Sequence, residues 1–205
     1  FGNNFTYTAT TLFTSLIPLT GSISTSNSIT CNGASTGTAS VSNLAGGSGN
    51  QNYTWFNGLV THTISNPSTL SAGIWTIVVS DAITGCTISQ IFFINQPPPL
   101  SLLVTATSAT ACVGSSVVLT GTASGGTPFS SGPAYTYSWS TGLSSNTRTV
   151  SHFVSGTFIY SLTSKDEYSC SVSNAIGVDF IANPIIGVTN SSICPLQTGT
   201  LIANG

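Results

Sequence analysis

The fold is decided by residues 31–86, which read CNGASTGTASVSNLAGGSGNQNYTWFNGLVTHTISNPSTLSAGIWTIVVSDAITGC. Within this stretch, residues 73–80 are β-branched and aromatic and give the strongest strand signal. Tyr53 and Trp55 alternate with polar residues, which places both on one face of an earlier strand. The stretch therefore predicts short strands around a small core.

The same plan recurs further along the chain. A second pass opens at Cys112, passes Tyr137-Ser138-Trp139 and closes on Cys170, and a third pass opens at Cys194. Cys31 and Cys112 are 81 residues apart, and Cys112 and Cys194 are 82 apart. A fixed period of this size predicts a tandem array of small domains.

Proline marks the expected joints between the domains. Pro18 lies 13 residues before Cys31, just as Pro99 lies 13 before Cys112. Proline cannot donate to a strand ladder, and the run Pro97-Pro98-Pro99 favours a stiff, extended joint. The expected division is a tail of a preceding β-sandwich repeat at 1–18, repeats at 19–98 and 99–184, and the start of a following repeat at 185–205. We therefore expect a segment of a longer chain.

The composition excludes several classes of partner. Charged residues make up 3% of the chain and the net charge is −2, against about a quarter charged in an average soluble domain. Without a basic field we expect no nucleic-acid partner. No apolar run is long enough for a membrane helix, so we expect no membrane insertion of this segment.

The pattern of strands predicts the fold class. No helical periodicity is present, and each repeat holds several short alternating stretches. We predict an all-β chain of tandem immunoglobulin-like Greek-key β-sandwiches stacked end to end. The expected strands are 22–30, 37–44, 52–57, 60–65, 73–80 and 87–95, then 100–107, 116–123, 134–141, 157–164 and 171–182. The expected core residues are Trp55, Trp139, Tyr53 and Tyr137.

Five cysteines without a Cys-x-x-Cys pair favour disulfides over zinc, and hence an extracytoplasmic setting. One bridge per domain, Cys31 with Cys86 and Cys112 with Cys170, is one reading. In a Greek-key sandwich, however, the turns that hold Cys31 and Cys86 lie at opposite poles, about 25 Å apart, whereas a bridge needs Cα atoms within about 7 Å. We favour an inter-domain bridge between Cys31 and Cys170, with Cys86, Cys112 and Cys194 bonded to neighbouring repeats. The pairing within each domain stays the alternative.

No pattern of catalytic or metal-binding residues emerges. One acid per turn falls short of a calcium site, so we expect Asp81 and Asp166 to bond backbone amides of their own turns. His62 and His152 stand in different repeats, with no nucleophile elbow elsewhere. We expect no enzyme, no metal and no cofactor.

The first repeat carries a recurring set of motifs, namely Cys31-x-Gly33, Gly46-Gly47, Tyr53-x-Trp55, Leu70-x-Ala72-Gly73, Trp75, Asp81 and Gly85-Cys86. Through these residues it resembles the SprB-type repeat of Bacteroidota cell-surface adhesins. The second repeat resembles the related immunoglobulin-like and PKD-like modules through Cys112-x-Gly114, Tyr137-x-Trp139, Gly156 and Cys170. It departs from the pattern in Ser169, where glycine is usual, and in a longer loop at 125–133.

The resemblance implies a long adhesin exported by type IX secretion, displayed at the outer membrane as a surface filament and driving gliding in some members. We expect this segment to be a structural stalk whose partners are neighbouring repeats of the same chain. One alternative is a glycan-binding module that uses the loop at 125–133 to bind surface glycans. Another is a sheath or surface-layer subunit that assembles with other adhesin chains through its edge strands.

Overall fold

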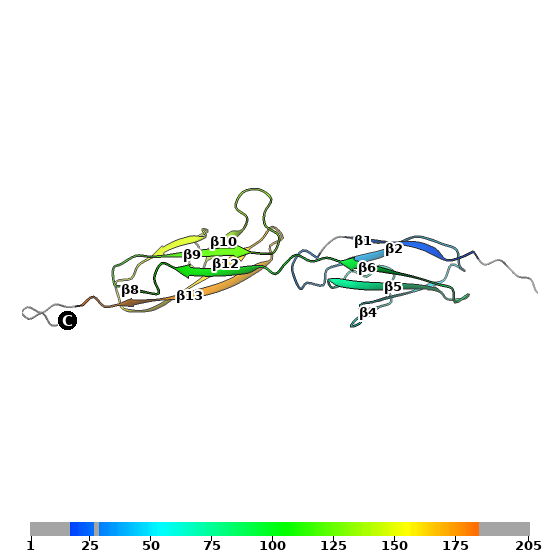
Figure 1. Cartoon of the computed structure of the whole chain (residues 1–205), viewed down its shortest axis with the longest axis horizontal. Coiled ribbons are helices and arrows are strands. Elements are labelled where there is room, and N and C mark those ends of the chain that lie inside the picture. Colours follow the sequence, from blue (N-terminus) through cyan, green and yellow to red (C-terminus); the bar gives the residue numbers. More distant parts are fainter. Residues whose placement is uncertain (1–16, 27–28, 185–205) are drawn as a thin grey trace, which may run out of the picture. The chain divides into compact units, whose positions relative to one another are not determined.

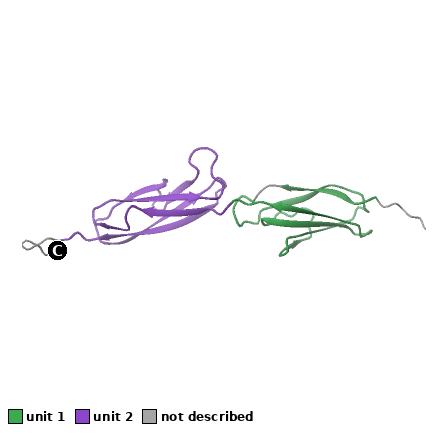
Figure 2. Ribbon diagram, in the orientation of Figure 1, with its two compact units in different colours: residues 1–97 green, residues 98–205 purple. Residues whose placement is uncertain are grey.

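A computed structural model gives the structure of the chain and describes residues 17–26 and 29–184. The chain divides into two compact units, Phe1–Pro97 and Pro98–Gly205 (Figure 2). All thirteen elements of the described residues are strands. Most of the expected tail at 1–18, the expected following repeat and Cys194 lie outside the described residues.

Unit 1 is a sandwich of two antiparallel sheets (Figure 1). One sheet has the order β1-β2 and the other β4-β3-β5-β6. Their strands are β1 (Thr20–Ser26), β2 (Thr38–Ala45), β3 (Gln51–Phe56), β4 (Thr61–His62), β5 (Gly73–Asp81) and β6 (Thr87–Ile94). Trp55 and Trp75 are buried between the sheets, and Tyr53 packs half-buried against the same cluster.

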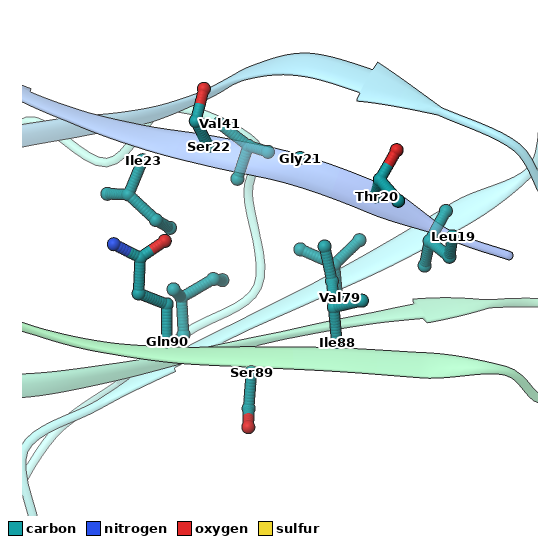
Figure 3. Close-up of a pocket in the computed structure, with 11 residues that line it drawn as sticks. Leu19, Thr20, Gly21, Ser22, Ile23, Val41, Val79, Ile88, Ser89 and Gln90 are labelled. Carbon is teal, nitrogen blue, oxygen red and sulfur yellow. The ribbon is translucent and has the colours of Figure 1, made fainter.

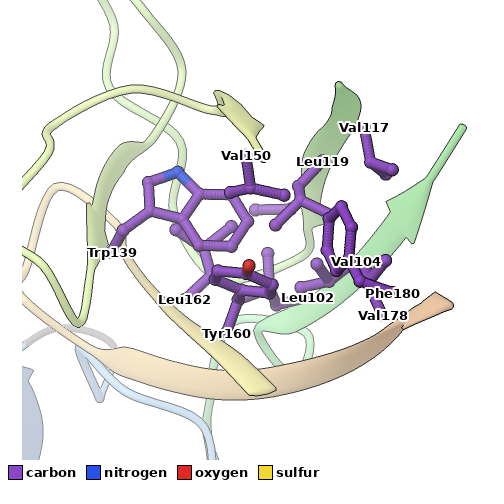
Figure 4. Packing of buried hydrophobic residues seen from close by; sticks show 11 residues of the cluster. Leu102, Val104, Val117, Leu119, Trp139, Val150, Tyr160, Leu162, Val178 and Phe180 are labelled. Atoms are coloured by element: carbon purple, nitrogen blue, oxygen red, sulfur yellow. The ribbon is translucent and has the colours of Figure 1, made fainter. Parts of the chain in front are cut away.

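Unit 2 has the same architecture with one more strand. Its sheets have the orders β11-β9-β7 and β10-β12-β13-β8, and β8 pairs with β13 in parallel. The strands are β7 (Ser101–Ala106), β8 (Thr110–Cys112), β9 (Val117–Ser124), β10 (Thr136–Trp139), β11 (Thr147–Val150), β12 (Gly156–Lys165) and β13 (Ser171–Ile181). Trp139 packs among aliphatic side chains of both sheets, as Figure 4 shows, and Tyr137 lies half-buried beside this cluster.

The two tryptophans on β3 and β10 also fix a loop in each unit. The Trp55 indole donates to the carbonyl of Ile64 at 2.8 Å, and that of Trp139 donates to the carbonyl of Ser145 at 2.9 Å. A buried indole N–H needs an acceptor, and here the returning loop supplies it. In each unit this tryptophan therefore packs in the core with its ring and fixes the following loop with its indole N–H.

Both units are immunoglobulin-like β-sandwiches, which confirms the predicted all-β class of tandem sandwiches. The sequence missed two strands, β8 and β11. Each has only three or four residues, too few for alternation to show. The expected strand at 60–65 shortens to the two residues of β4, because the chain then turns to bring the Ile64 carbonyl to Trp55.

Candidate functional site

A buried carboxylate joins two loops at one end of unit 1. Asp81, only 1% exposed, ends β5. Its Oδ2 accepts hydrogen bonds from the backbone nitrogen of Ser48 at 2.5 Å and from the Ser48 hydroxyl at 2.8 Å. Its Oδ1 accepts from the Thr84 nitrogen at 2.7 Å and the Ile83 nitrogen at 3.1 Å. These bonds, led by that from the Ser48 amide, hold the pKa of the Asp81 carboxyl well below its ordinary value.

Unit 2 repeats this arrangement with Asp166, which is also 1% exposed. Oδ2 accepts from the Thr127 nitrogen at 2.9 Å, and Oδ1 accepts from the nitrogens of Cys170 at 3.0 Å and Tyr168 at 3.1 Å. The expectation that both acids bond amides of their own turns is confirmed. The bond across to the preceding loop was not predicted, because its partner is 33 residues away in unit 1 and 39 in unit 2. We call this arrangement the carboxylate lock.

The paired glycines before each lock are explained by its geometry. A Cβ on Gly47 would lie 2.6 Å from Asp81 Oδ2, and one on Gly126 would lie 2.5 Å from Asp166 Oδ2. Both glycines have a positive φ, 68° and 59°. Only glycine takes that conformation freely while leaving room for the carboxylate.

The cysteines fall into two groups. Cys31 and Cys170 are disulfide-bonded. Cys86 and Cys112 are free thiols, the first exposed and the second half-buried. The alternative of one bridge per domain, Cys31 with Cys86 and Cys112 with Cys170, is therefore wrong for this structure.

The physical reason is strand length. In unit 1, Asn32 beside Cys31 donates from Nδ2 to the Pro97 carbonyl at 2.9 Å, so Cys31 lies past the end of β6. Cys86 immediately precedes the start of β6, which has 8 residues. At about 3.3 Å per residue, the strand separates the two cysteines by about 26 Å. A disulfide cannot span that distance.

The same relation holds in unit 2. Cys112 pairs with Ile181, the last residue of β13, whereas Cys170 immediately precedes the first. The strand has 11 residues and is therefore about 36 Å long. Cys170 lies instead near the start of the unit, because Asp166 holds it beside the loop in which the Gly126 nitrogen donates to the Pro98 carbonyl.

The long loop at 125–133 leaves unit 2 before β10 and projects away from the sheets (Figure 1). Its base is held by the Tyr135 hydroxyl, which donates to the Gly125 carbonyl at 2.9 Å. Beside it lies an open groove of about 670 Å³. The groove is lined by Pro133, Ala134, Tyr135, Thr136, Tyr137 and residues 144–146.

A smaller groove of about 220 Å³ opens between β1 and β6 of unit 1 (Figure 3). Apolar side chains including Ile23, Val79 and Ile88 line it. The strand register explains its origin. Thr20 pairs with Ala45 and Ser101 with Ser124, so Gly21 of unit 1 corresponds to Leu102 of unit 2. Leu102 is buried in the core of its unit, and the groove lies where unit 1 lacks that side chain.

The two histidines sit in separate aromatic contacts within their own units. His152 stacks on Phe158 with ring centroids 3.4 Å apart, and its Nε2 lies 2.7 Å from the Tyr160 hydroxyl. His62 lies 5.7 Å from the Trp75 ring. Among residues 17–26 and 29–184, no three His, Cys, Asp or Glu side chains gather as a metal would need, and no helix has the length and apolarity to span a membrane.

Comparison with known proteins gives similarity of fold alone. No protein-family model and no curated protein matches the chain. Among solved structures, the chain is similar to the three N-terminal domains of the bacteriophage RB49 Highly Immunogenic Outer Capsid protein (Hoc), with 17% identity, a TM-score of 0.37, and 80% of this chain and 59% of that chain covered. It is also similar to the fibronectin(III)-like modules of Clostridium thermocellum CbhA, with 12% identity, a TM-score of 0.34 and coverage of 78% and 95%.

A third match is a structure concerned with Dscam isoform specificity, at 14% identity, a TM-score of 0.31, and 82% of this chain and 47% of that chain covered. This chain thus spans about half of the Dscam chain and 59% of the Hoc chain. Disulfide bonding fits an extracellular domain.

Proposed function

We propose that this chain is a structural stalk segment of a long extracellular adhesin or surface filament. Its task would be mechanical: immunoglobulin-like modules placed end to end hold a distant tip away from a cell. The proposal is supported by two units of one plan, each with a carboxylate lock between its loops. It assigns no catalytic role to any residue, and its partners are neighbouring repeats of the same chain.

The observation that carries the proposal is the position of the two bonded cysteines. Cys31 lies at the end of unit 1 where Asn32 binds the carbonyl of Pro97, its last residue. Cys170 lies at the end of unit 2 that holds Pro98, its first residue. We therefore infer that Cys31 and Cys170 bond to each other across the proline joint. Such a bridge would covalently restrain the joint at Pro97 and Pro98. We call this arrangement the stapled joint.

The remaining cysteines would extend the same scheme along the filament. Cys86 precedes β6 as Cys170 precedes β13. Cys31 and Cys112 each open a turn, in which the carbonyl of Cys31 accepts from the Ala34 nitrogen and that of Cys112 from the Ser115 nitrogen. We propose that Cys86 bonds to the repeat before it, and that Cys112 and Cys194 bond to repeats after them. A free thiol in an extracellular module is otherwise exposed to oxidation.

The resemblance to SprB-type repeats supplies the setting of this proposal. It would place the filament on the outer membrane of a Bacteroidota cell, after type IX secretion. In that setting the stalk would serve attachment to surfaces or gliding. The low charge supports a filament whose stiffness is insensitive to salt.

Small-angle scattering tests the stapled joint. We expect the oxidised chain to populate a narrow range of maximum dimensions and the chain with reductant a wider one. Cys31→Ser should behave like the reduced chain, whereas Cys86→Ser, the matched control, should behave like the oxidised one. Identical scattering with and without reductant would contradict the proposal.

A glycan-binding module is the second candidate, favoured by the groove beside the loop at 125–133. Half-buried Tyr135 and Tyr137 line it, and tyrosine rings pack against sugar faces while hydroxyls accept or donate hydrogen bonds. Binding of the oxidised chain to a glycan array, lost in Tyr135→Ala, would favour this candidate over the stalk.

A further inference from the structure

The outer face of the β4-β3-β5-β6 sheet in unit 1 is unusually apolar for a surface. Side chains on β5 alternate, so that Trp75 and Ile77 point into the core while Ile74 is 64% exposed. On β6, Ile91 is 69% and Phe93 58% exposed, and Phe56 at the end of β3 is 40% exposed. The outer face of an antiparallel sheet is ordinarily polar where water covers it.

The strand register makes these side chains neighbours. Ile74 pairs directly with Phe93 across β5 and β6. One row further, Phe56 pairs with Thr76, and Thr76 pairs with Ile91. Side chains directly opposite in adjacent strands lie about 5 Å apart, so these residues form one continuous cluster. We call it the outer apolar patch.

Unit 2 shows that the fold does not require this patch. Asp81 corresponds to Asp166 and Cys86 to Cys170, which aligns β5 with β12 and β6 with β13. Three of the four patch positions are then small or polar: Phe56 becomes Ser140, Ile91 becomes Ala175 and Phe93 becomes Gly177. Only Ile74 keeps an apolar equivalent, Ile159.

The rest of the unit 2 face is polar as well. Thr163 and Ser173 lie within hydrogen-bond distance at 2.8 Å, and the Thr157 hydroxyl donates to Asp179 at 2.5 Å. Lys165 is also exposed on this face. The outer face of this sheet is thus polar in unit 2 and carries an apolar patch in unit 1. Because the fold does not need the patch, we look for its role in binding a partner.

The chemistry of the face indicates what covers it. Its outward residues are all uncharged, namely Asn52, Thr54, Phe56, Thr61, Ile74, Thr76, Val78, Ser80, Thr87, Ser89, Ile91 and Phe93. A charged partner would find no complementary group here, whereas a second copy meets this face without like-charge repulsion. Two flat sheets pack face to face about 10 Å apart, as the two sheets of a sandwich do.

The size of the face sets the strength of such a contact. The strands β4, β3, β5 and β6 have 2, 6, 9 and 8 residues, so at about 3.3 Å per residue and about 4.8 Å between strands the face presents about 400 Å². Two copies would then bury about 800 Å², which is in the range of weak, transient contacts. A single contact would be weak, but repeated contacts along two filaments would add through avidity.

We propose that the outer apolar patch is a homotypic docking surface, through which two copies of this chain associate side by side. The contact forms between the same faces of the two copies, and its largest exposed apolar side chains include Phe93 and Ile91 on the edge strand β6. It differs from assembly through strand edges, since no backbone group takes part. It is independent of the stapled joint, so either proposal can fail without the other.

Sedimentation velocity of the oxidised chain from about 10 µM to about 1 mM tests the proposal, since this range brackets a weak dimer. The average mass should rise toward that of a dimer. Phe93→Thr and Ile91→Thr place threonine, which strands favour, at each position and should each shift the transition at least tenfold higher in concentration. Ile159→Thr, the matched exposed change in unit 2, should leave it where it was.

A measurement without mutation guards against misfolded variants. In NMR spectra of the unaltered chain, dilution should shift the amide signals of Thr76, Ile91 and Phe93 and leave those of Thr163 and Ser173 in place. A mass that stays monomeric at the highest concentration would overturn the proposal. So would a dimer that persists unchanged in the folded Phe93→Thr variant, because that would assign association to another surface.

Discussion

Asp81 Oδ2 lies 2.5 Å from the backbone nitrogen of Ser48, a residue 33 positions earlier in the chain. The bond connects the loop between β2 and β3 to the turn between β5 and β6. Asp166 makes the same connection to Thr127 in unit 2. The lock therefore fixes one end of each sandwich by connecting two loops that are far apart in the sequence.

Removing the lock should destabilise its unit. Asp166→Ala deletes a buried carboxylate that accepts three backbone bonds. We expect the free energy of unfolding of unit 2 to fall by about 3 kcal/mol, since bonds to a charged group are worth about 1.5–3 kcal/mol each and part is recovered by water. Urea denaturation followed by tryptophan fluorescence measures it. Asp179→Ala, an exposed acid with one hydroxyl partner, is the control and should cost less than about 1 kcal/mol.

Acid should weaken unit 1 through Asp81. Its pKa is lower in the folded state than in the unfolded chain, so the unfolded chain takes up a proton first as the pH falls. The stabilisation is complete above the ordinary carboxyl pKa of about 3.9 and is lost progressively below it. Thermal denaturation from pH 7 down to pH 2 should show this loss. In Asp81→Asn the slope below pH 4 should flatten; an unchanged slope would assign the acid sensitivity to other groups.

Glycine at the lock should not tolerate a methyl group. Gly126 and Gly132 both have a positive φ, 59° and 80°, but only Gly126 faces a carboxylate, since a Cβ there would lie 2.5 Å from Asp166 Oδ2. Gly132→Ala should cost about 1 kcal/mol for the backbone alone. Gly126→Ala should cost at least about 2 kcal/mol more in urea denaturation, because Asp166 must move away from its amides. If the two variants lose the same free energy of unfolding, the close approach of residue 126 to the Asp166 carboxylate does not contribute to stability.

The groove of unit 1 should accept a small side chain. A Cβ on Gly21 would lie 3.1 Å from the terminal methyl of Leu44 and 3.4 Å from those of Ile88 and Val41. Flexible methyl groups can yield, so Gly21→Ala should stabilise unit 1 by about 0.5–1 kcal/mol by restricting the unfolded chain. Gly37→Ala is the contrasting variant, because its Cβ would lie 2.8 Å from the backbone oxygen of Leu70. That variant should be destabilised in the same denaturation assay.

The sequence predicted what local patterns determine. Residues 73–80 indicate a strand by composition alone, and β5 covers them. Trp55 and Trp139 recur at one strand position, and both are buried. The predicted fold class followed from such stretches and their period.

Features that depend on contacts between distant residues were missed. Nothing near Asp81 in the sequence indicates that Ser48 completes its hydrogen bonds. The groove at Gly21 emerges only when the strand register aligns it with Leu102. The outer apolar patch needs the pairing of Phe93 with Ile74, which alternation within one strand does not give.

Peptide mapping of the oxidised chain under non-reducing conditions tests the stapled joint most directly. Proteolysis followed by mass spectrometry should recover a linked pair that contains Cys31 and Cys170 and disappears on reduction. Cys86 and Cys112 should be alkylated in the isolated chain, because their proposed partners lie in neighbouring repeats. A linked pair of Cys31 with Cys86, or of Cys112 with Cys170, would contradict both the strand geometry of each unit and the proposed stalk.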